Sequence, residues 1–320
     1  MIRVAITVDT DSDYYFGDKA SLQNSDDKSI IGWSGIDQGM SLLSSAINDF
    51  SKKNNIDIPI SWFVRCDGQI GDQYGSRSYL LDEYKDWWRE RILKGDEIQW
   101  HAHLCYKNKD KWFQETKYQG LYNDIKKSSE SFKNTNFDYS FIRIGECYYS
   151  DNLLKILNEM KIKFGSTALP NRFRNDEEKL LDWRGTPNRP YYPSKENYRV
   201  EGCDNYDFRE FPLNTINTKV SYDKEEIPRY VNLSFNEGVI KSGLSKFFEK
   251  QDTLISITHP HEILPKFFTD SQLKKHPLLS FSQCSVSKNL NDIILCANEL
   301  GREIKFVKMS DLTLDIKEGR

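Results

Sequence analysis

Three pairs of chemically active residues share one spacing in this sequence, and each pair follows a run of residues typical of a β-strand. The pairs are Asp9 with Asp11 in VAITVDTD, His101 with His103 in GDEIQWHAH, and His259 with His261 in TLISITHPH. In extended chain, residues i and i+2 point to the same side, so each pair can present two ligating or catalytic groups to one point.

The elements that must position these pairs alternate between strand and helix patterns, which predicts an α/β fold with a mainly parallel sheet. The predicted strands are Ile2–Val8, Ile60–Val64, Glu97–His101, Ser140–Ile144, Arg209–Phe211, Thr253–Thr258 and Glu303–Val307. The predicted helices are Met40–Phe50, Tyr79–Leu93, Tyr122–Phe132, Asn152–Met160 and Lys288–Leu300. Gly95 and Gly301 follow two of them and are expected to form left-handed C-terminal caps.

A cluster of Asp and His at the carboxyl ends of parallel strands is typical of a metal centre, because those ends face one common surface. A catalytic zinc ion usually has three protein ligands and one water, and Asp11, His101 and His103 fill those three places. Taken singly, an Asp after a strand can be a turn former, and a lone His is more often a hydrogen-bonded core or surface residue. The joint pattern favours the metal site, with Cys105 as an alternative ligand.

Composition restricts the class of protein. With 38% apolar and 13% aromatic residues among 320, the chain can fill a core, and we expect one domain over residues 1–320 with an irregular insertion at about 169–205. The net charge of −3 gives no reason to expect nucleic acid as a partner. The six cysteines form no CxxC pair, and the first residues read as a core strand without a leader or membrane segment, so a cytoplasmic location is expected.

Several segments, in this order along nearly the whole chain, resemble motifs of the polysaccharide deacetylases, carbohydrate esterase family 4 with the NodB homology domain. They are ITVDTD, PISWFV, GDEIQWHAH, FIRIGECYYSDNLLKILNEMKIKFGSTALP, LDWRGTPNRPYYPS, REFPLNTI and SITHPHE. The segments LDWRGTPNRPYYPS and REFPLNTI are similar to those of bacterial members linked to surface polysaccharides. The resemblance implies a distorted β/α barrel of about seven strands, a divalent metal ion, expected to be zinc, and hydrolysis of an acetamido group on a sugar.

The resemblance also implies roles for individual residues. Asp9 would be the catalytic base, Arg143 would orient it, and His259 would be the general acid. The implied metal ligands are Asp11, His101 and His103. A backbone N–H near Glu146 is a candidate to stabilise the oxyanion.

The sequence departs from the family pattern in two places. The second motif usually has its histidines four residues apart, which would place the second at Cys105 rather than at His103. Gly165 stands where many relatives carry Asp, so the partner that orients the general acid is open, with Asp182 and Glu262 as alternatives.

We therefore expect a metal-dependent N-deacetylase that acts on an N-acetylated sugar, nucleotide-linked or lipid-linked, in surface-polysaccharide biosynthesis. Trp183 in the irregular segment is a candidate for stacking on a sugar ring, with a core or surface position as its alternative. His261 is a candidate for substrate contact or for support of the site. Two other functions stay open: a carbohydrate-binding protein that has lost catalysis, and an amidohydrolase acting on a small non-sugar amide.

Overall fold

The structure is a computed structural model that describes residues 1–11, 35–109, 111–176, 180–264 and 276–314. The chain divides into two compact units. Unit 1 comprises Met1–Ile60 and Asn214–Leu312, and unit 2 comprises Ser61–Leu213 with the C-terminal residues from Thr313. Each unit contains one part of the predicted chemistry.

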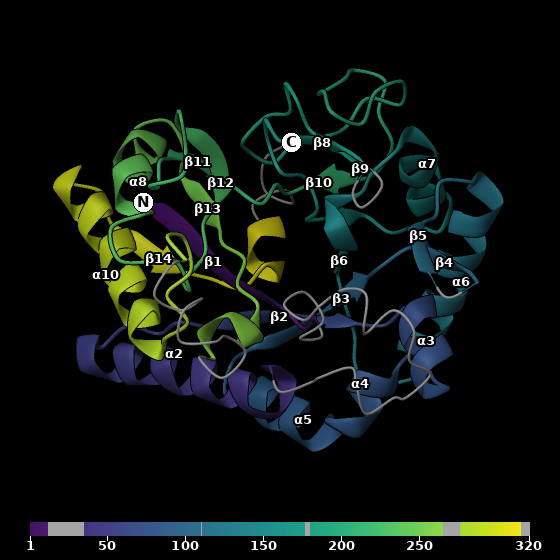
Figure 1. Ribbon diagram of the computed structural model, residues 1–320, viewed down its shortest axis with the longest axis horizontal. Helices are drawn as coiled ribbons and strands as arrows, with labels where there is room; N and C mark the ends of the chain where they lie inside the picture. Colours follow the sequence, from purple (N-terminus) through teal and green to yellow (C-terminus); the bar gives the residue numbers. More distant parts are fainter. Residues whose placement is uncertain (12–34, 110, 177–179, 265–275, 315–320) are drawn as a thin grey trace. The chain divides into compact units, whose positions relative to one another are not determined.

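Unit 1 is built around β1, whose residues are almost all buried and rich in Val and Ile, as a strand covered on both faces requires. β1 (Ile2–Asp9) pairs in parallel with β13 (Thr253–Ile255) and β14 (Ile304–Phe306). Helices α2 (Met40–Asn54) and α10 (Gln283–Glu299) lie side by side, and α8 (Lys241–Phe248) packs on α10 (Figure 1). The remaining elements are η3 (Gly35–Gly39), β11 (Thr215–Thr218), β12 (Ile227–Tyr230), η5 (Pro260–Ile263) and η7 (Ser310–Thr313).

Unit 2 contains five parallel strands, hydrogen-bonded in the order β10-β7-β6-β3-β2. They are β2 (Ile60–Arg65), β3 (Glu97–Ala102), β6 (Phe141–Ile144), β7 (Phe164–Gly165) and β10 (Arg209–Glu210). Its helices are α3 (Gly68–Tyr74), α4 (Tyr79–Glu83), α5 (Lys85–Leu93), α6 (Tyr118–Lys133), η4 (Gly145–Cys147) and α7 (Asp151–Glu159). Two hairpins complete it, β4 (Cys105–Asn108) with β5 (Lys111–Gln114) and β8 (Phe173–Asn175) with β9 (Leu180–Asp182).

Both units contain parallel strands alternating with helices, β13-β1-β14 in unit 1 and β10-β7-β6-β3-β2 in unit 2. This confirms the predicted α/β fold, a distorted barrel with a parallel sheet. The register places His101 beside Arg143 on neighbouring strands. The carboxyl ends of β3 and β6 therefore bring two predicted site residues together from distant parts of the sequence.

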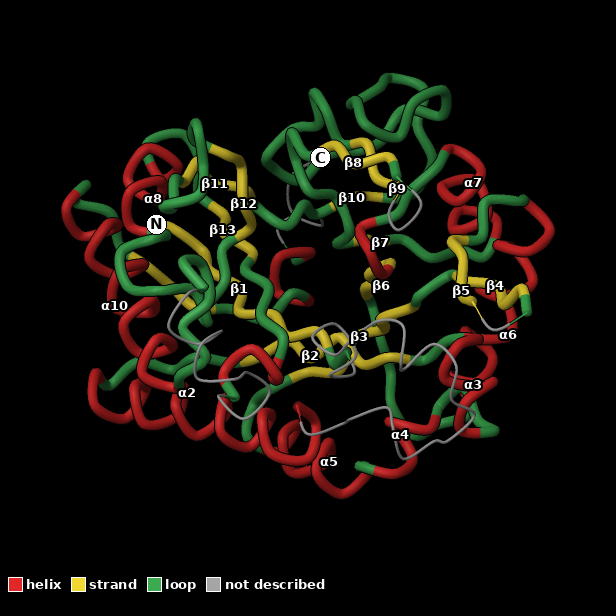
Figure 2. Tube along the Cα trace, viewed as in Figure 1, coloured by secondary structure: helices red, strands yellow, loops and turns green. Residues whose placement is uncertain are grey.

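All seven predicted strands are present, but the helices and loops differ in detail. The predicted helix Tyr79–Leu93 is interrupted at Tyr84, whose backbone lies outside the α-helical region at φ −102° and ψ 24°. Gly95 and Gly301 have positive φ, as the predicted caps require. Segment 169–205 is mainly loop (Figure 2), yet it contains the β8–β9 hairpin and isolated bridges such as Tyr191 with Glu210.

Candidate active site

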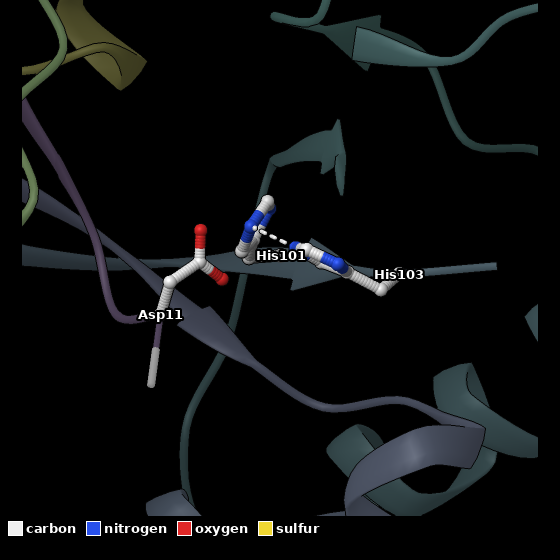
Figure 3. Close-up of side chains that lie close together, drawn as sticks. All are labelled: Asp11, His101 and His103. Atoms are coloured by element: carbon white, nitrogen blue, oxygen red, sulfur yellow. Dashed lines mark hydrogen bonds between the residues drawn. The ribbon is translucent and has the colours of Figure 1, made fainter. Parts of the chain in front are cut away.

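The two histidines that end β3 face each other. His101 and His103 are 2% and 5% exposed, and their Nε2 atoms are 3.1 Å apart (Figure 3). The rings are almost perpendicular, with an interplanar angle of 86°. Because β3 is buried and extended up to Ala102, the i and i+2 side chains lie on one side of the chain, as the spacing predicts.

The ring of His101 is fixed by the neighbouring strand. Its Nδ1 lies 3.0 Å from the carbonyl oxygen of Arg143, which can only accept a hydrogen bond. The proton of the neutral imidazole is therefore on Nδ1, and the Nε2 lone pair is directed toward His103. This is the tautomer that a metal-binding Nε2 requires, with a backbone carbonyl as the outer partner.

His103 is held through its backbone by a buried ion pair. Its N–H donates to Asp67 Oδ2 at 3.1 Å, and Arg65 Nε donates to the same oxygen at 2.8 Å. Asp67 also caps α3 by accepting the N–H of Ile70 at 3.0 Å. Burial alone would raise the pKa of Asp67, but the Arg65 guanidinium outweighs burial and lowers it. The Asp67 carboxylate thus stays charged and ties the backbone of His103 to Arg65 and to the start of α3.

Asp67→Ala is expected to lower the free energy of unfolding by about 3–5 kcal/mol, because it leaves the Arg65 charge buried without its partner. Urea unfolding followed by circular dichroism measures this change. The control is Asp207→Ala, which removes an exposed ion pair with Lys163 in the same unit and should cost less than about 1 kcal/mol. Equal effects of the two substitutions would contradict a structural role for the buried pair.

Arg143 is buried, with 1% of its surface exposed, and its guanidinium lies 3.8 Å from the centre of the Phe63 ring. Nε donates to the carbonyl of Ser166 at 2.7 Å, and Nη2 lies 3.0 Å from the Ser166 hydroxyl. Asp9, which Arg143 is predicted to orient, belongs to the other unit. That interaction stays a prediction.

In unit 1, the predicted general acid lies between two carboxylates. His259 Nε2 is 3.5 Å from Asp11 Oδ2, and its Nδ1 is 3.3 Å from Glu262 Oε1. Asp9, the last residue of β1, donates its N–H to the carbonyl of Thr258 at 3.1 Å. The parallel pairing of β1 therefore continues to the residues that carry these side chains, and it brings three of the predicted site residues together.

Glu262 is the carboxylate beside His259, and it has further partners. Its Oε2 accepts hydrogen bonds from Asn232 Nδ2 at 2.7 Å, from the Ser234 hydroxyl at 3.0 Å and from the backbone N–H of His259 at 3.1 Å. Burial alone would raise the pKa of Glu262, but the interaction with His259 outweighs burial and lowers it to about 2. The sequence analysis did not identify Asn232 and Ser234, because neither carries a local signal linking it to residue 262.

The two histidines of the last pair have opposite protonation preferences. Burial would lower the pKa of His259, but Glu262 and then Asp11 outweigh it and raise that pKa to about 9. Burial, together with the positive charge of His259, lowers the pKa of His261 to about 4. At neutral pH, His259 is therefore charged and can donate a proton, whereas His261 is neutral.

Two candidates in the irregular segment lie elsewhere in unit 2. Trp183 is 1% exposed, donates its indole N–H to the carbonyl of Cys147 at 2.9 Å, and packs edge-to-face on Tyr198. Asp182 pairs with Arg199 and Arg184. Trp183 thus occupies the core position given as its alternative, and Glu262 is the carboxylate beside His259, the predicted general acid.

The turn after β6 has an uncommon backbone. Glu146 and Cys147 have φ values of 56° and 51°, a region that L-residues seldom adopt and that costs on the order of 1–3 kcal/mol each. The preceding Gly145 lies against His103, and a Cβ at position 145 would overlap the imidazole ring. The proposed oxyanion role of a backbone N–H near Glu146 stays a prediction.

Comparison with known proteins identifies the fold. No protein-family model and no curated protein matches the sequence. Among solved structures, a protein from Mycobacterium smegmatis provisionally described as a polysaccharide deacetylase matches with 12% identity and a TM-score of 0.53, over 99% of this chain and 90% of that one. The Puue allantoinase matches with 10% identity and a TM-score of 0.50, over 100% and 91%. At these identities the likeness establishes the fold, in agreement with the family resemblance of the motifs.

None of the helices in the described ranges has the length and apolar character needed to span a membrane.

Proposed function

We propose that this protein is a metal-dependent deacetylase of the polysaccharide deacetylase family, acting on an N-acetylated amino sugar. The observation that carries the proposal is the pair of imidazoles, His101 and His103, with their Nε2 atoms 3.1 Å apart. Two nitrogens bound to one tetrahedral zinc ion at ordinary bond lengths are about 3.3 Å apart. The pair therefore suits two ligands of one ion.

Asp11 is the third proposed ligand. Asp11, His101 and His103 are each buried (Figure 3), and we infer that their donor atoms bind one ion. One carboxylate with two imidazoles is a donor set that suits zinc, and three protein ligands leave a position for water or substrate. When bound, a divalent ion would polarise the amide carbonyl and lower the pKa of a water molecule.

The other residues supply the proton transfers. Asp9 accepts the proton of the attacking water, and Arg143 orients the Asp9 carboxylate. The breaking C–N bond needs a proton on nitrogen, because an amine anion is a very poor leaving group. His259, which is charged at neutral pH, donates this proton, and Glu262 holds its ring by Nδ1.

Gly145→Ala is expected to weaken zinc binding by roughly 10–100-fold, because the added methyl group displaces the His103 ring. Competition with a zinc-binding dye measures this change. The control is Gly75→Ala, at a position where a Cβ meets nothing within 4 Å. That variant should keep zinc affinity, although its positive φ makes the substitution strained.

The test of the proposed function combines metal analysis with a substrate panel. The purified protein is stripped with a chelator and reloaded with zinc or cobalt, and acetate release is measured with nucleotide-linked, lipid-linked and oligomeric N-acetylated sugars and with small non-sugar amides. Metal-dependent acetate release from a sugar supports the proposal. Turnover of a non-sugar amide alone would favour the amidohydrolase, and sugar binding without turnover would favour a non-catalytic homologue.

A further inference from the structure

A buried carboxyl group that the mechanism above does not use lies in unit 2. Glu210, at the end of β10, is 1% exposed, and its Oε1 accepts the N–H groups of Thr167 and Ala168 at 2.6 and 2.7 Å. Within the described residues, its Oε2 is buried and has no hydrogen-bond partner. Burying a carboxyl group costs free energy. The hydrogen bonds that Glu210 accepts here come from two backbone N–H groups, so its burial needs an explanation.

The backbone that Glu210 holds is the segment that contacts Arg143. Residue 166 offers both its carbonyl and its hydroxyl to the guanidinium, at 2.7 and 3.0 Å. The hydroxyl of Thr167 accepts the N–H of Ile144 at 2.9 Å, which ties the same segment to the strand of Arg143. A chain of direct contacts thus runs from Glu210 through residues 166–168 to the guanidinium.

Gly165 leaves the space that the Glu210 carboxyl group occupies. A Cβ at position 165 would lie 2.5 Å from Glu210 Oε2 and 2.5 Å from Cζ of Phe208. Gly165 has no positive φ that would require glycine. Space for the Glu210 carboxyl and the Phe208 ring is therefore the physical reason for a glycine here.

We propose that Glu210 is a positioning residue for the deacetylase reaction: it fixes residues 166–168 so that Ser166 sets the direction of the Arg143 guanidinium. The inference rests on the proposed function for its effect on turnover. Its structural part concerns unit 2 alone. Burial, opposed by the two N–H groups and by the charge of Arg143, raises the pKa of Glu210 to about 7, in keeping with a group enclosed beside the guanidinium.

The test compares Glu210→Ala with Glu210→Gln. The amide oxygen of Gln can accept both N–H groups, whereas Ala leaves them without a partner. In nitrogen-15 NMR spectra, the Arg143 Nε–H signal, assigned by its loss in Arg143→Lys, should be protected from solvent exchange in the wild type and in Glu210→Gln. In Glu210→Ala it should shift and lose protection, and kcat should fall by about 10²-fold at a similar KM and unchanged zinc content.

Gly165→Ala provides a second perturbation if Glu210→Ala does not fold, because it displaces the same carboxyl group and keeps its charge. It should shift the Arg143 Nε–H signal in the same direction. An unchanged signal in folded Glu210→Ala or in Gly165→Ala would overturn the inference, whatever the activity. If the wild-type protein hydrolyses no amide but the variants still shift the Arg143 signal, the positioning of Arg143 is supported and only the proposed function is contradicted.

Discussion

His101→Ala is expected to abolish stoichiometric zinc binding and to lower kcat/KM by roughly 10³-fold or more, since metal polarisation contributes several kcal/mol to the transition state. The substitution removes the imidazole whose tautomer is set by the Arg143 carbonyl and whose Nε2 faces that of His103. Metal analysis by mass spectrometry and acetate release measure the two effects. Circular dichroism establishes that the fold is retained.

Two further variants decide whether His103 or Cys105 binds the metal together with His101. His103→Gln should lose the metal, whereas Cys105→Ser should keep it, because burial followed by the Asp67 charge raises the pKa of the Cys105 thiol to about 12. A thiol that resists deprotonation is a poor ligand. The reverse result, with metal retained in His103→Gln and lost in Cys105→Ser, would transfer the ligand role to Cys105.

The positions of the paired residues could be predicted because strand patterns are local. β1 and β3 are short buried runs that end in chemically active residues, and the i, i+2 spacing places those residues on one side. β7 could not be predicted, because two residues carry no periodicity. Its place in the sheet depends on pairing with β6 and β10, which are distant in sequence.

The hydrogen-bond partners of the site residues also divide into those that the local sequence predicts and those that it does not. Glu262 lies three residues after His259 and completes a capping box at the start of η5, which is a pattern that sequence alone can reveal. Asp67 accepts the backbone N–H of His103, and Glu210 accepts that of Thr167, from other strands or loops. Such polar contacts are set by the packing of the sheet, so only the structure could identify them.

The second large effect is expected at His259, the proposed general acid. His259→Ala should lower kcat by roughly 10²–10⁴-fold and leave zinc bound, since it removes the proton donor to the leaving nitrogen. In the wild type, the pKa of His259 is raised from 6.5 to about 9, so the acid form is present below that pH. The pH–rate profile should therefore fall as pH rises through about 9. The same shift stabilises the folded state fully below pH 6.5, and this stabilisation is lost as pH rises through about 9.

Glu262→Gln tests whether deprotonation of His259 causes the fall in rate at high pH, the falling limb of the pH–rate profile. It removes the carboxylate that contributes most to raising the pKa of His259, against the opposing effect of burial, so the falling limb should move to lower pH. Glu237→Gln is the matched control, because that carboxylate is exposed and pairs with Lys288 on the surface of the same unit. A limb that stays at about pH 9 in Glu262→Gln would show that His259 is not the group being titrated. In that case, the loss of turnover in His259→Ala would have to come from altered substrate binding, which a raised KM would reveal.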